Sequence, residues 1–461
     1  MVANPTRRQL TIAAGSAIGA SLAGCLGGDS DDGSSEAVHL MTDYGSDAWQ
    51  TKWNDELIPA FEEQSDHEIN LEVTGGGSQA EQRLSTLVQS GDPPDTITNN
   101  HAGVAQNVAA GQLQSVDEIN DAMSELAGDL VAPPIEFGDD VYQVPHGYYE
   151  ATFLYREDVY EALDLSPPET FQDLLENARI IDESDEFDTR GIGVPASSGL
   201  VMADAFFRSL YNNTASARLR WASDSQEEVE LWFPKEPAVE VLELVSELAA
   251  YSPDPSQIGF AQGLEDWGAG SYAQQIHLNM WPAGVAAAID PEIARNTGVS
   301  HIPLQAGVAK EDTLLVNEVN GYFVFDGGGN TAGAREFIEW LYTDDLERLA
   351  GVYEPAPMRF LPTHEGVLES DAYQSISHFQ EFPSHLEKLQ QVQEISDEYV
   401  HNDWDGVTPI RTVEGIYLRQ GYQLGEMLHE VLVAGMDPEE AYETYRSEME
   451  SRLSDAKERF E

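Results

Sequence analysis

Residues 141–158 of this chain read Val141-Tyr142-Gln143-Val144-Pro145-His146-Gly147-Tyr148-Tyr149-Glu150-Ala151-Thr152-Phe153-Leu154-Tyr155-Arg156-Glu157-Asp158. In a β-strand, successive side chains point to opposite faces. Tyr148 and Tyr149 are neighbours in this stretch. We therefore expect one of the two rings to face a cleft and the other to face the protein core.

A helix start follows shortly after this stretch, within residues 163–175. Thr170, with Asp173 three residues later, is an N-cap signature. The apolar residues after it recur at the spacing of one helix face, at Leu174, Leu175, Ala178 and Ile181. The sequence therefore predicts a capped amphipathic helix that begins after Thr170.

Before residue 141 the chain alternates between strand and helix patterns. Strands are predicted at 37–41, 68–73 and 95–98, and helices at 49–64 and 79–89. This alternation, with short connections, predicts a mostly parallel sheet. Such sheets bind ligands beyond the carboxyl ends of their strands. The residues at those ends are Asp43-Tyr44 and Asn99-Asn100-His101.

The stretches at 141–158 and 163–175 resemble the family 1 extracellular solute-binding proteins, the sugar receptors of ABC importers. The resemblance continues in the family's order at 190–195, where the family has a strand, and at 279–284, 319–324, 330–341 and 433–441. The chain departs from the family at Ala283-Gly284-Val285, because the family often has a sugar-stacking Trp after the Gly. Two interpretations stay open here: Trp281 replaces that ring, or the pocket differs from that of the family.

This resemblance implies an α/β, two-lobed fold of the type II periplasmic-binding-protein class, with a mostly parallel sheet and flanking helices in each lobe. Residues 36–148 plus 321–368 would form the N-terminal lobe, and residues 149–320 plus 369–461 the C-terminal lobe. Hinge crossovers would lie near 148–150, 320 and 363–373, and the lobes would close on a small solute. The ABC permease in the membrane is the implied partner. A monomer is expected, with no catalytic residue, cofactor or metal.

Sugars present hydroxyl groups around an apolar face, so a sugar site needs flat aromatic rings with carboxylate, amide and arginine side chains. The candidates are Asp43, Tyr44, Asn99, Asn100, His101, Tyr148, Glu150, Trp281, Asn320, Tyr322, Arg359 and Trp404. By family position, Glu150 matches an acidic residue that receives sugar hydroxyls, whereas Trp404 rests only on its place before the last helices. Two alternatives stay open: Trp281 or Trp404 as interlobe core, and Asn99-Asn100 as a helix-capping loop.

The composition is strongly acidic, with 83 Asp and Glu against 23 Lys and Arg and a formal net charge of −60. The chain also has 8 Trp, 18 Tyr and 16 Phe, so the charge is a surface property and does not indicate disorder. This bias resembles proteins of halophilic archaea. In molar salt the Debye length shrinks to ~3 Å, and acidic surfaces stay hydrated and soluble. Nucleic acid is excluded as a partner because phosphate binding needs basic patches.

The first 35 residues predict export and anchoring. Residues 1–24, with Arg7-Arg8 and a short weakly apolar run, resemble a twin-arginine signal peptide. Leu22-Ala23-Gly24-Cys25 resembles a lipoprotein box, which would place a lipid on Cys25 and hold the protein at the extracellular face of the cell membrane. The alternative is a buried structural cysteine; as the only cysteine, it forms no disulfide framework. Residues 25–35 are expected to be a flexible acidic tether.

Other solutes and one other activity stay open. A polyamine would suit an acidic chain, whereas glycerol phosphate would need arginine clusters that the predicted loops lack. A neutral mono- or oligosaccharide is favoured. A secreted carbohydrate-active hydrolase needs two opposed carboxylates, but no catalytic motif indicates one. Asn212-Asn213-Thr214 fits the N-glycosylation motif.

Overall fold

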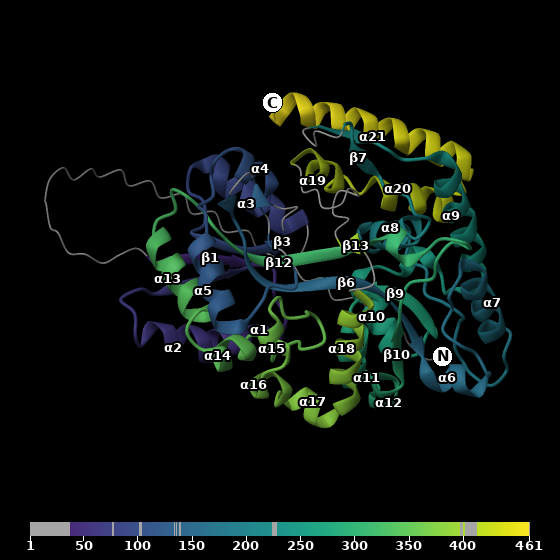
Figure 1. The fold of residues 1–461 in the computed structure, drawn as a ribbon, viewed down its shortest axis with the longest axis horizontal. Helices are drawn as coiled ribbons and strands as arrows, with labels where there is room; N and C mark the ends of the chain where they lie inside the picture. Colours follow the sequence, from purple (N-terminus) through teal and green to yellow (C-terminus); the bar gives the residue numbers. More distant parts are fainter. Residues whose placement is uncertain are drawn as a thin grey trace, which may run out of the picture. The chain divides into compact units, whose positions relative to one another are not determined.

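The computed structural model describes residues 37–75, 78–100, 104–132, 134, 136–137, 140–223, 228–396, 400–401 and 413–460. By its contacts the chain divides into Met1–Ser35 and Glu36–Glu461, and the fold is that of the second unit (Figure 1). The predicted signal peptide, Cys25 and the tether lie outside the described residues, as do His101 and Trp404.

The described residues form a central sheet of seven strands. Six of them follow the order β10-β6-β12-β3-β1-β2, and β9 also pairs with β6 (Figure 1). Their bounds are β1 Val38–Thr42, β2 Ile69–Val73, β3 Thr96–Asn100, β6 Val144–Arg156, β9 Gln274–Leu278, β10 Thr297–Ser300 and β12 Asn317–Val324. Three two-stranded ribbons join β4 Glu136–Phe137 to β5 Asp140–Val141, β7 Leu219–Trp221 to β8 Val229–Leu231, and β11 Leu314–Leu315 to β13 Val400–His401.

The predicted elements at the start of the chain are confirmed within three residues. The helix predicted at 49–64 is continuous but changes type, as α1 Asp47–Thr51, a π-helical segment Lys52–Leu57, and α2 Ile58–Glu62. The Ser46 hydroxyl caps it by accepting a hydrogen bond from the Trp49 N–H. α3 Ser78–Ser90 ends before Gly91, whose φ of 78° lies in the left-handed region that glycine tolerates.

Parallel pairing is found among β1, β2 and β3, whereas β12 pairs with β3 and β6 in the antiparallel sense. The α/β fold class is confirmed. Antiparallel strands enter because β6 and β12 carry the chain through the sheet in opposite directions instead of returning by a crossover helix.

β6 changes its partner at the middle of its length. Residues up to Glu150 pair with β12, with Tyr149 directly opposite Glu318. Residues from Ala151 pair with β9, and Thr297–Ser300 of β10 also pair with this second half. Tyr148 exchanges two backbone hydrogen bonds of 3.0 Å with Leu361. β6 is therefore a single strand that pairs with β12 along its first half and with β9 and β10 along its second half.

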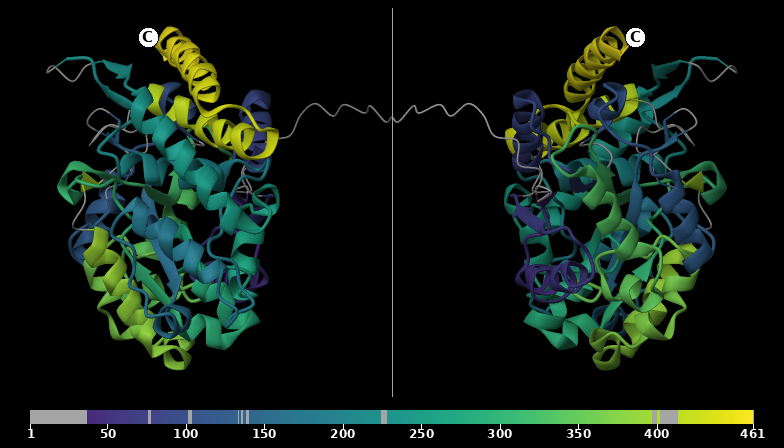
Figure 2. Two further views of the ribbon diagram at one scale, coloured as in Figure 1. Left: turned by 90° about the vertical axis from the view of Figure 1, so that its right-hand side faces the viewer. Right: turned by 90° about the vertical axis from the view of Figure 1, so that its left-hand side faces the viewer.

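Helices cover the sheet, and their bounds after α3 are α4 Ala105–Ala109, α5 Asp117–Ala127, α6 Glu157–Ala162, α7 Phe171–Asp182, α8 Val201–Asn212, α9 Lys235–Leu248, α10 Phe260–Gly268, α11 Trp281–Ile289, α12 Pro291–Arg295, α13 Thr331–Tyr342, α14 Leu346–Gly351, α15 Glu365–Leu368, α16 Asp371–Gln374, α17 Ser377–Glu381, α18 Pro383–Ser396, α19 Val413–Arg419, α20 Gln423–His429 and α21 Pro438–Phe460. α13 packs on β1 and β12, and α21 packs against α9, α19 and α20 (Figure 2). α20 approaches α8 closely, since a Cβ at Gly425 would lie 2.5 Å from the Leu200 carbonyl oxygen.

The predicted capping box at Thr170 is confirmed. The Thr170 hydroxyl accepts from the Asp173 N–H at 3.2 Å, and the Asp173 carboxylate accepts from the Thr170 N–H at 2.9 Å. Three of the four residues predicted for the apolar face are fully buried, and Leu175 is partly buried. The cap and the buried face together fix where α7 begins and which side it turns to the core.

One expectation is wrong. Residues 190–195 form no strand beyond an isolated bridge between Arg190 and Tyr272. Their backbone N–H groups divide between two segments, since Gly193 donates to Gln274 and Ile192 donates to Tyr251. Asn212 is 1% exposed at the end of α8, and a glycan needs an accessible side chain. No described helix combines the length and the apolar character that a membrane crossing requires.

Candidate functional site

An arginine surrounded by aromatic rings lies where several connections meet. We define the arginine–aromatic cluster as Asp43, Tyr44, Tyr149, Trp281, Arg359 and Phe360. Asp43 and Tyr44 follow β1, Tyr149 is in β6, Trp281 opens α11, and Arg359 and Phe360 lie between α14 and α15. These elements are far apart in sequence, and only the fold brings their side chains together.

Arg359 is the centre of this cluster. Its guanidinium carbon lies 4.4 Å from the ring centroid of Trp281 and 4.7 Å from those of Tyr44 and Phe360. Its Nε donates to the Tyr149 hydroxyl at 2.8 Å. Tyr149 and Trp281 stack with centroids 6.1 Å apart and an interplanar angle of 11°. Cation–π contacts and one hydrogen bond therefore hold the cation in place.

Half of the cluster is buried and half is partly exposed. Tyr44, Tyr149 and Phe360 are buried, whereas Asp43, Trp281 and Arg359 are partly exposed. Burial raises the pKa of Asp43, and the Arg359 charge offsets part of this rise. Burial also raises the pKa of Tyr149, so its hydroxyl stays protonated. The cluster thus combines aromatic rings, the Arg359 cation, the Asp43 carboxyl group and the Tyr149 hydroxyl in one place.

A neutral histidine packs against two buried rings of the cluster. The His146 ring centroid lies 5.8 Å from that of Tyr44 and 5.0 Å from that of Phe360. Its Nδ1 is 2.7 Å from the Tyr342 hydroxyl. Burial lowers the pKa of His146 to about 3, so the ring is uncharged at neutral pH.

Asn279 joins three segments under the cluster. Its Oδ1 accepts from the Glu150 N–H at 2.8 Å, and its Nδ2 donates to the carbonyls of Tyr148 at 3.0 Å and Arg359 at 3.2 Å. Its φ of 47° lies in the left-handed region. Asn tolerates this region better than most residues, because its short polar side chain bonds to nearby backbone.

A second charged group, the buried ion cluster (Asp204, Arg208, Glu318 and Arg419), lies beside the first. Glu318 lies opposite Tyr149 in the ladder, and opposite residues share a face of the sheet. Arg419 donates to Glu318 at 3.0 Å and lies 3.7 Å from Asp204. Arg208 lies 3.9 Å from Asp204 and 4.0 Å from Glu318. Mutual pairing offsets part of the cost of burying these charges, because among these contacts only the one between Arg419 and Glu318 is as short as a hydrogen bond.

The structure brings together four of the predicted site residues, Asp43, Tyr44, Trp281 and Arg359. Tyr148 and Glu150 point to the face of β6 opposite Tyr149, and their exposures are 2% and 1%. Tyr322 is fully buried, with its ring 5.6 Å from that of Tyr342.

The predicted asparagines occupy two paired strands. Asn99 pairs with Gly321, and Asn100 pairs with Asn320, across the β3–β12 ladder. The alternative of a helix-capping loop at Asn99-Asn100 is therefore wrong, because β3 continues through Asn100.

Five residues near the site did not stand out in the sequence: Tyr149, Phe360, Asn279, Glu318 and Arg419. Tyr149 carried a signal, since alternation required one ring of the Tyr148-Tyr149 pair to face each side. Glu318 and Arg419 carried none, because isolated charges in an acidic chain are ordinarily surface residues.

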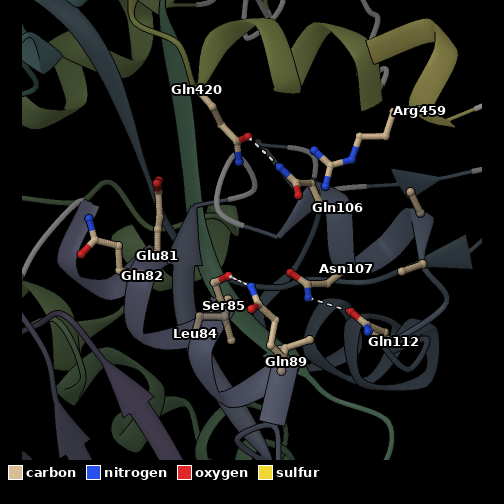
Figure 3. Close-up of a pocket in the computed structure, with 13 residues that line it drawn as sticks. Glu81, Gln82, Leu84, Ser85, Gln89, Gln106, Asn107, Gln112, Gln420 and Arg459 are labelled. Carbon is tan, nitrogen blue, oxygen red and sulfur yellow. Dashed lines mark hydrogen bonds between the residues drawn. The ribbon is translucent and has the colours of Figure 1, made fainter. Parts of the chain in front are cut away.

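A separate cavity of about 640 Å³ lies between α3 and α4, and Gln420 and Arg459 also line it (Figure 3). Six of its thirteen lining residues carry side-chain amides: Gln82, Gln89, Gln106, Asn107, Gln112 and Gln420. No residue of the predicted set and no aromatic ring lines it. The arginine–aromatic cluster therefore remains the candidate site, because stacking on a sugar needs a ring.

Within the described ranges, no group of three or more His, Cys, Asp or Glu is placed to hold a metal ion.

Comparison with known proteins relates most of the chain to one family. Residues 45–347 match the sequence profile of the family described as "Bacterial extracellular solute-binding protein". No curated protein sequence matches the chain.

Three solved structures illustrate the similarity of fold. A solute-binding protein of Thermotoga lettingae, bound to α-D-tagatose, has a TM-score of 0.68 and 18% identity, covering 91% of this chain and 100% of its own. The GacH receptor of Streptomyces glaucescens, solved without ligand and with acarbose, has a TM-score of 0.69 and 16% identity over 91% and 99%. A sugar transporter protein of Arthrobacter chlorophenolicus, bound to laminaribiose, has a TM-score of 0.71 and 16% identity over 90% and 99%. At these identities the similarity establishes the fold.

Proposed function

Because the chain belongs to the family of bacterial extracellular solute-binding proteins, we propose that it captures a mono- or oligosaccharide and delivers it to the permease of an ABC importer. The observation that carries this proposal is the arginine–aromatic cluster. Trp281 offers a partly exposed ring, and Arg359 and Asp43 offer a donor and an acceptor beside it. Rings combined with such polar groups are what a sugar ring and its hydroxyls require.

The ligands of the structural relatives favour a sugar over the other solutes. Tagatose, acarbose and laminaribiose are sugars or sugar analogues. A polyamine is disfavoured because Arg359 already places a positive charge among the rings, and like charges repel.

Capture by hinge closure is supported by the course of the chain. We assign residues 36–148 plus 321–368 to one lobe and 149–320 plus 369–461 to the other. β6 exchanges β12 for β9 between Glu150 and Ala151, at the first proposed crossover. α15 contacts α5, whereas α18 contacts β10, which fits a further crossover between these helices. The candidate site then draws Tyr44 from one lobe and Trp281 from the other.

Thermal-shift and calorimetric screening in molar NaCl tests the function. A saccharide should raise the melting temperature by binding only the folded chain. Trp281→Ala should abolish the shift, whereas Trp232→Ala, a partly buried Trp 5.7 Å below Arg220, should preserve it. Binding of spermidine or glycerol phosphate with no saccharide would contradict the proposal. Disappearance of the sugar over time would instead indicate a hydrolase.

We further propose that the protein is exported by the twin-arginine route and anchored through a lipid on Cys25, as a monomer at the extracellular face of the membrane. The support is the sequence of residues 1–35 together with the family, whose members are extracellular. Cys25→Ser should release the protein into the medium with its solute affinity unchanged. Loss of affinity in this variant would show that Cys25 is part of the fold.

A further inference from the structure

Arg359 is a partly exposed cation without a carboxylate ion pair in the described part of the chain. Its charge is coupled to Asp43 only over a distance, and its one hydrogen bond to a side chain joins Nε to the neutral Tyr149 hydroxyl. A guanidinium has five donors, so the N–H groups of its two Nη atoms remain available. Partial removal of a cation from water without a counter-ion costs free energy, which cation–π contacts offset only in part.

Arg419, on the same side of the sheet, provides a direct contrast. It also lies over a tyrosine, with its guanidinium carbon 4.8 Å from the ring centroid of Tyr422. Yet Arg419 has Glu318 at 3.0 Å and Asp204 at 3.7 Å. The chain has 83 acidic residues, so composition does not explain the missing partner of Arg359. Among the described residues, the charge of Arg359 is therefore left without a carboxylate partner of its own.

The chemistry of the site selects the kind of anion. The planar fork of a guanidinium matches a carboxylate with two parallel hydrogen bonds. A phosphate dianion would bring twice the charge against one arginine, with the Asp43 carboxyl group nearby. One carboxylate balances one guanidinium, and the partly exposed Trp281 ring beside it suits the apolar face of a sugar.

We propose that the solute is a sugar acid, whose carboxylate pairs with Arg359 while its ring packs on Trp281. This inference rests on the proposed function and specifies the charge of the saccharide bound at the same site. Arg359 is then the residue that distinguishes an acidic sugar from its neutral counterpart.

The experiment compares matched sugars on the mature chain by calorimetry in molar NaCl at neutral pH. D-Glucuronate is paired with D-glucose, and D-galacturonate with D-galactose. At least one acid should bind about tenfold or more tightly than its neutral partner, as for a hydrogen-bonded charge pair. Arg359→Gln should bring this ratio close to one, and Arg359→Lys should give an intermediate ratio because the charge remains without the fork. The control is Arg452→Gln, an arginine 4.3 Å above the Tyr417 ring, which should preserve the ratio.

The ratio is measured within each variant, so a general loss of stability affects both sugars alike. Equal or tighter binding of the neutral sugars, or an equal loss of both in Arg359→Gln, would overturn the sugar-acid assignment and leave the saccharide receptor standing. Failure of every sugar acid to bind would also overturn it. Binding of spermidine with no saccharide of either charge would overturn the proposed function as well.

Discussion

The Asn279 side chain accepts a hydrogen bond of 2.8 Å from the backbone N–H of Glu150, at the residue where β6 changes its partner. The same amide donates to two carbonyls, so one side chain satisfies three backbone groups of two distant segments. Buried backbone groups without partners are costly. Asn279 therefore stabilises β6 at the point where this strand changes its partner.

Substitution of Asn279 should separate hydrogen bonding from backbone strain. Asn279→Gly removes the three bonds but tolerates the φ of 47°, and should lower the free energy of unfolding by about 2 kcal/mol. Asn279→Ala keeps a Cβ in the left-handed region without the side-chain bonds that make this region tolerable for Asn, and should cost about 1 kcal/mol more. Denaturant unfolding in molar NaCl measures both. Equal stability of the Gly and Ala variants would mean that strain plays no part.

Tyr149→Phe should weaken solute binding with little change in stability. The variant keeps the stacked ring but removes the hydroxyl that holds Arg359 Nε at 2.8 Å, so the guanidinium loses its orientation. The affinity should fall about tenfold, the value of one hydrogen bond to a charged group. Tyr160→Phe, which removes a buried bond to Gln274 away from the cluster, is the matched control. Equal affinities of the two variants would contradict a positioning role for Tyr149.

The capping box of α7 should contribute to stability alone. Thr170→Ala removes an acceptor for the Asp173 N–H and should lower the free energy of unfolding by about 1 kcal/mol. Thr170→Ser keeps the hydroxyl and should restore most of this loss. Solute affinity should be unchanged in both, since α7 contributes no residue to the cluster. A change in affinity would mean that the start of α7 is coupled to the site.

His146 should make the protein less stable in acid. The unfolded histidine binds a proton below about pH 6.5. The folded protein resists this because burial lowers the pKa of His146 to about 3. The stabilisation is therefore complete above the unfolded pKa and is lost as the pH falls towards the folded one. His146→Gln should reduce the slope of unfolding free energy against pH, between about pH 5 and 6, by about 1 kcal/mol per unit. An unchanged slope would show that the ring titrates normally.

The sequence predicted the parts of the fold that local signals determine. Alternating patterns placed β1 to β3, and the Thr170 cap placed α7, within three residues. The stretch at 190–195 was misjudged, because its backbone partners come from tertiary contacts that no local pattern reveals. The burial of Asn212 could not be predicted either, since it depends on the packing around α8.

For the site, side chains at strand ends and loops were predictable, as Asp43 and Tyr44 show. The face of β6 was not. Which of Tyr148 and Tyr149 meets Arg359 depends on pairing with β12, and the register shifts between Asn320 and Gly321. A one-residue change of phase moves every side chain to the other face.

The position of β12 has a consequence for synthesis of the chain. It lies between β3 and β6, yet Asn317–Val324 emerge from the ribosome long after both neighbours. Until then the inner edges of β3 and β6 have no partner, and open edges are templates for pairing with other chains. Contacts that close so late in the sequence also form slowly. The edges of β3 and β6 in a nascent chain are thus open to pairing with other chains until synthesis reaches the last third of the polypeptide.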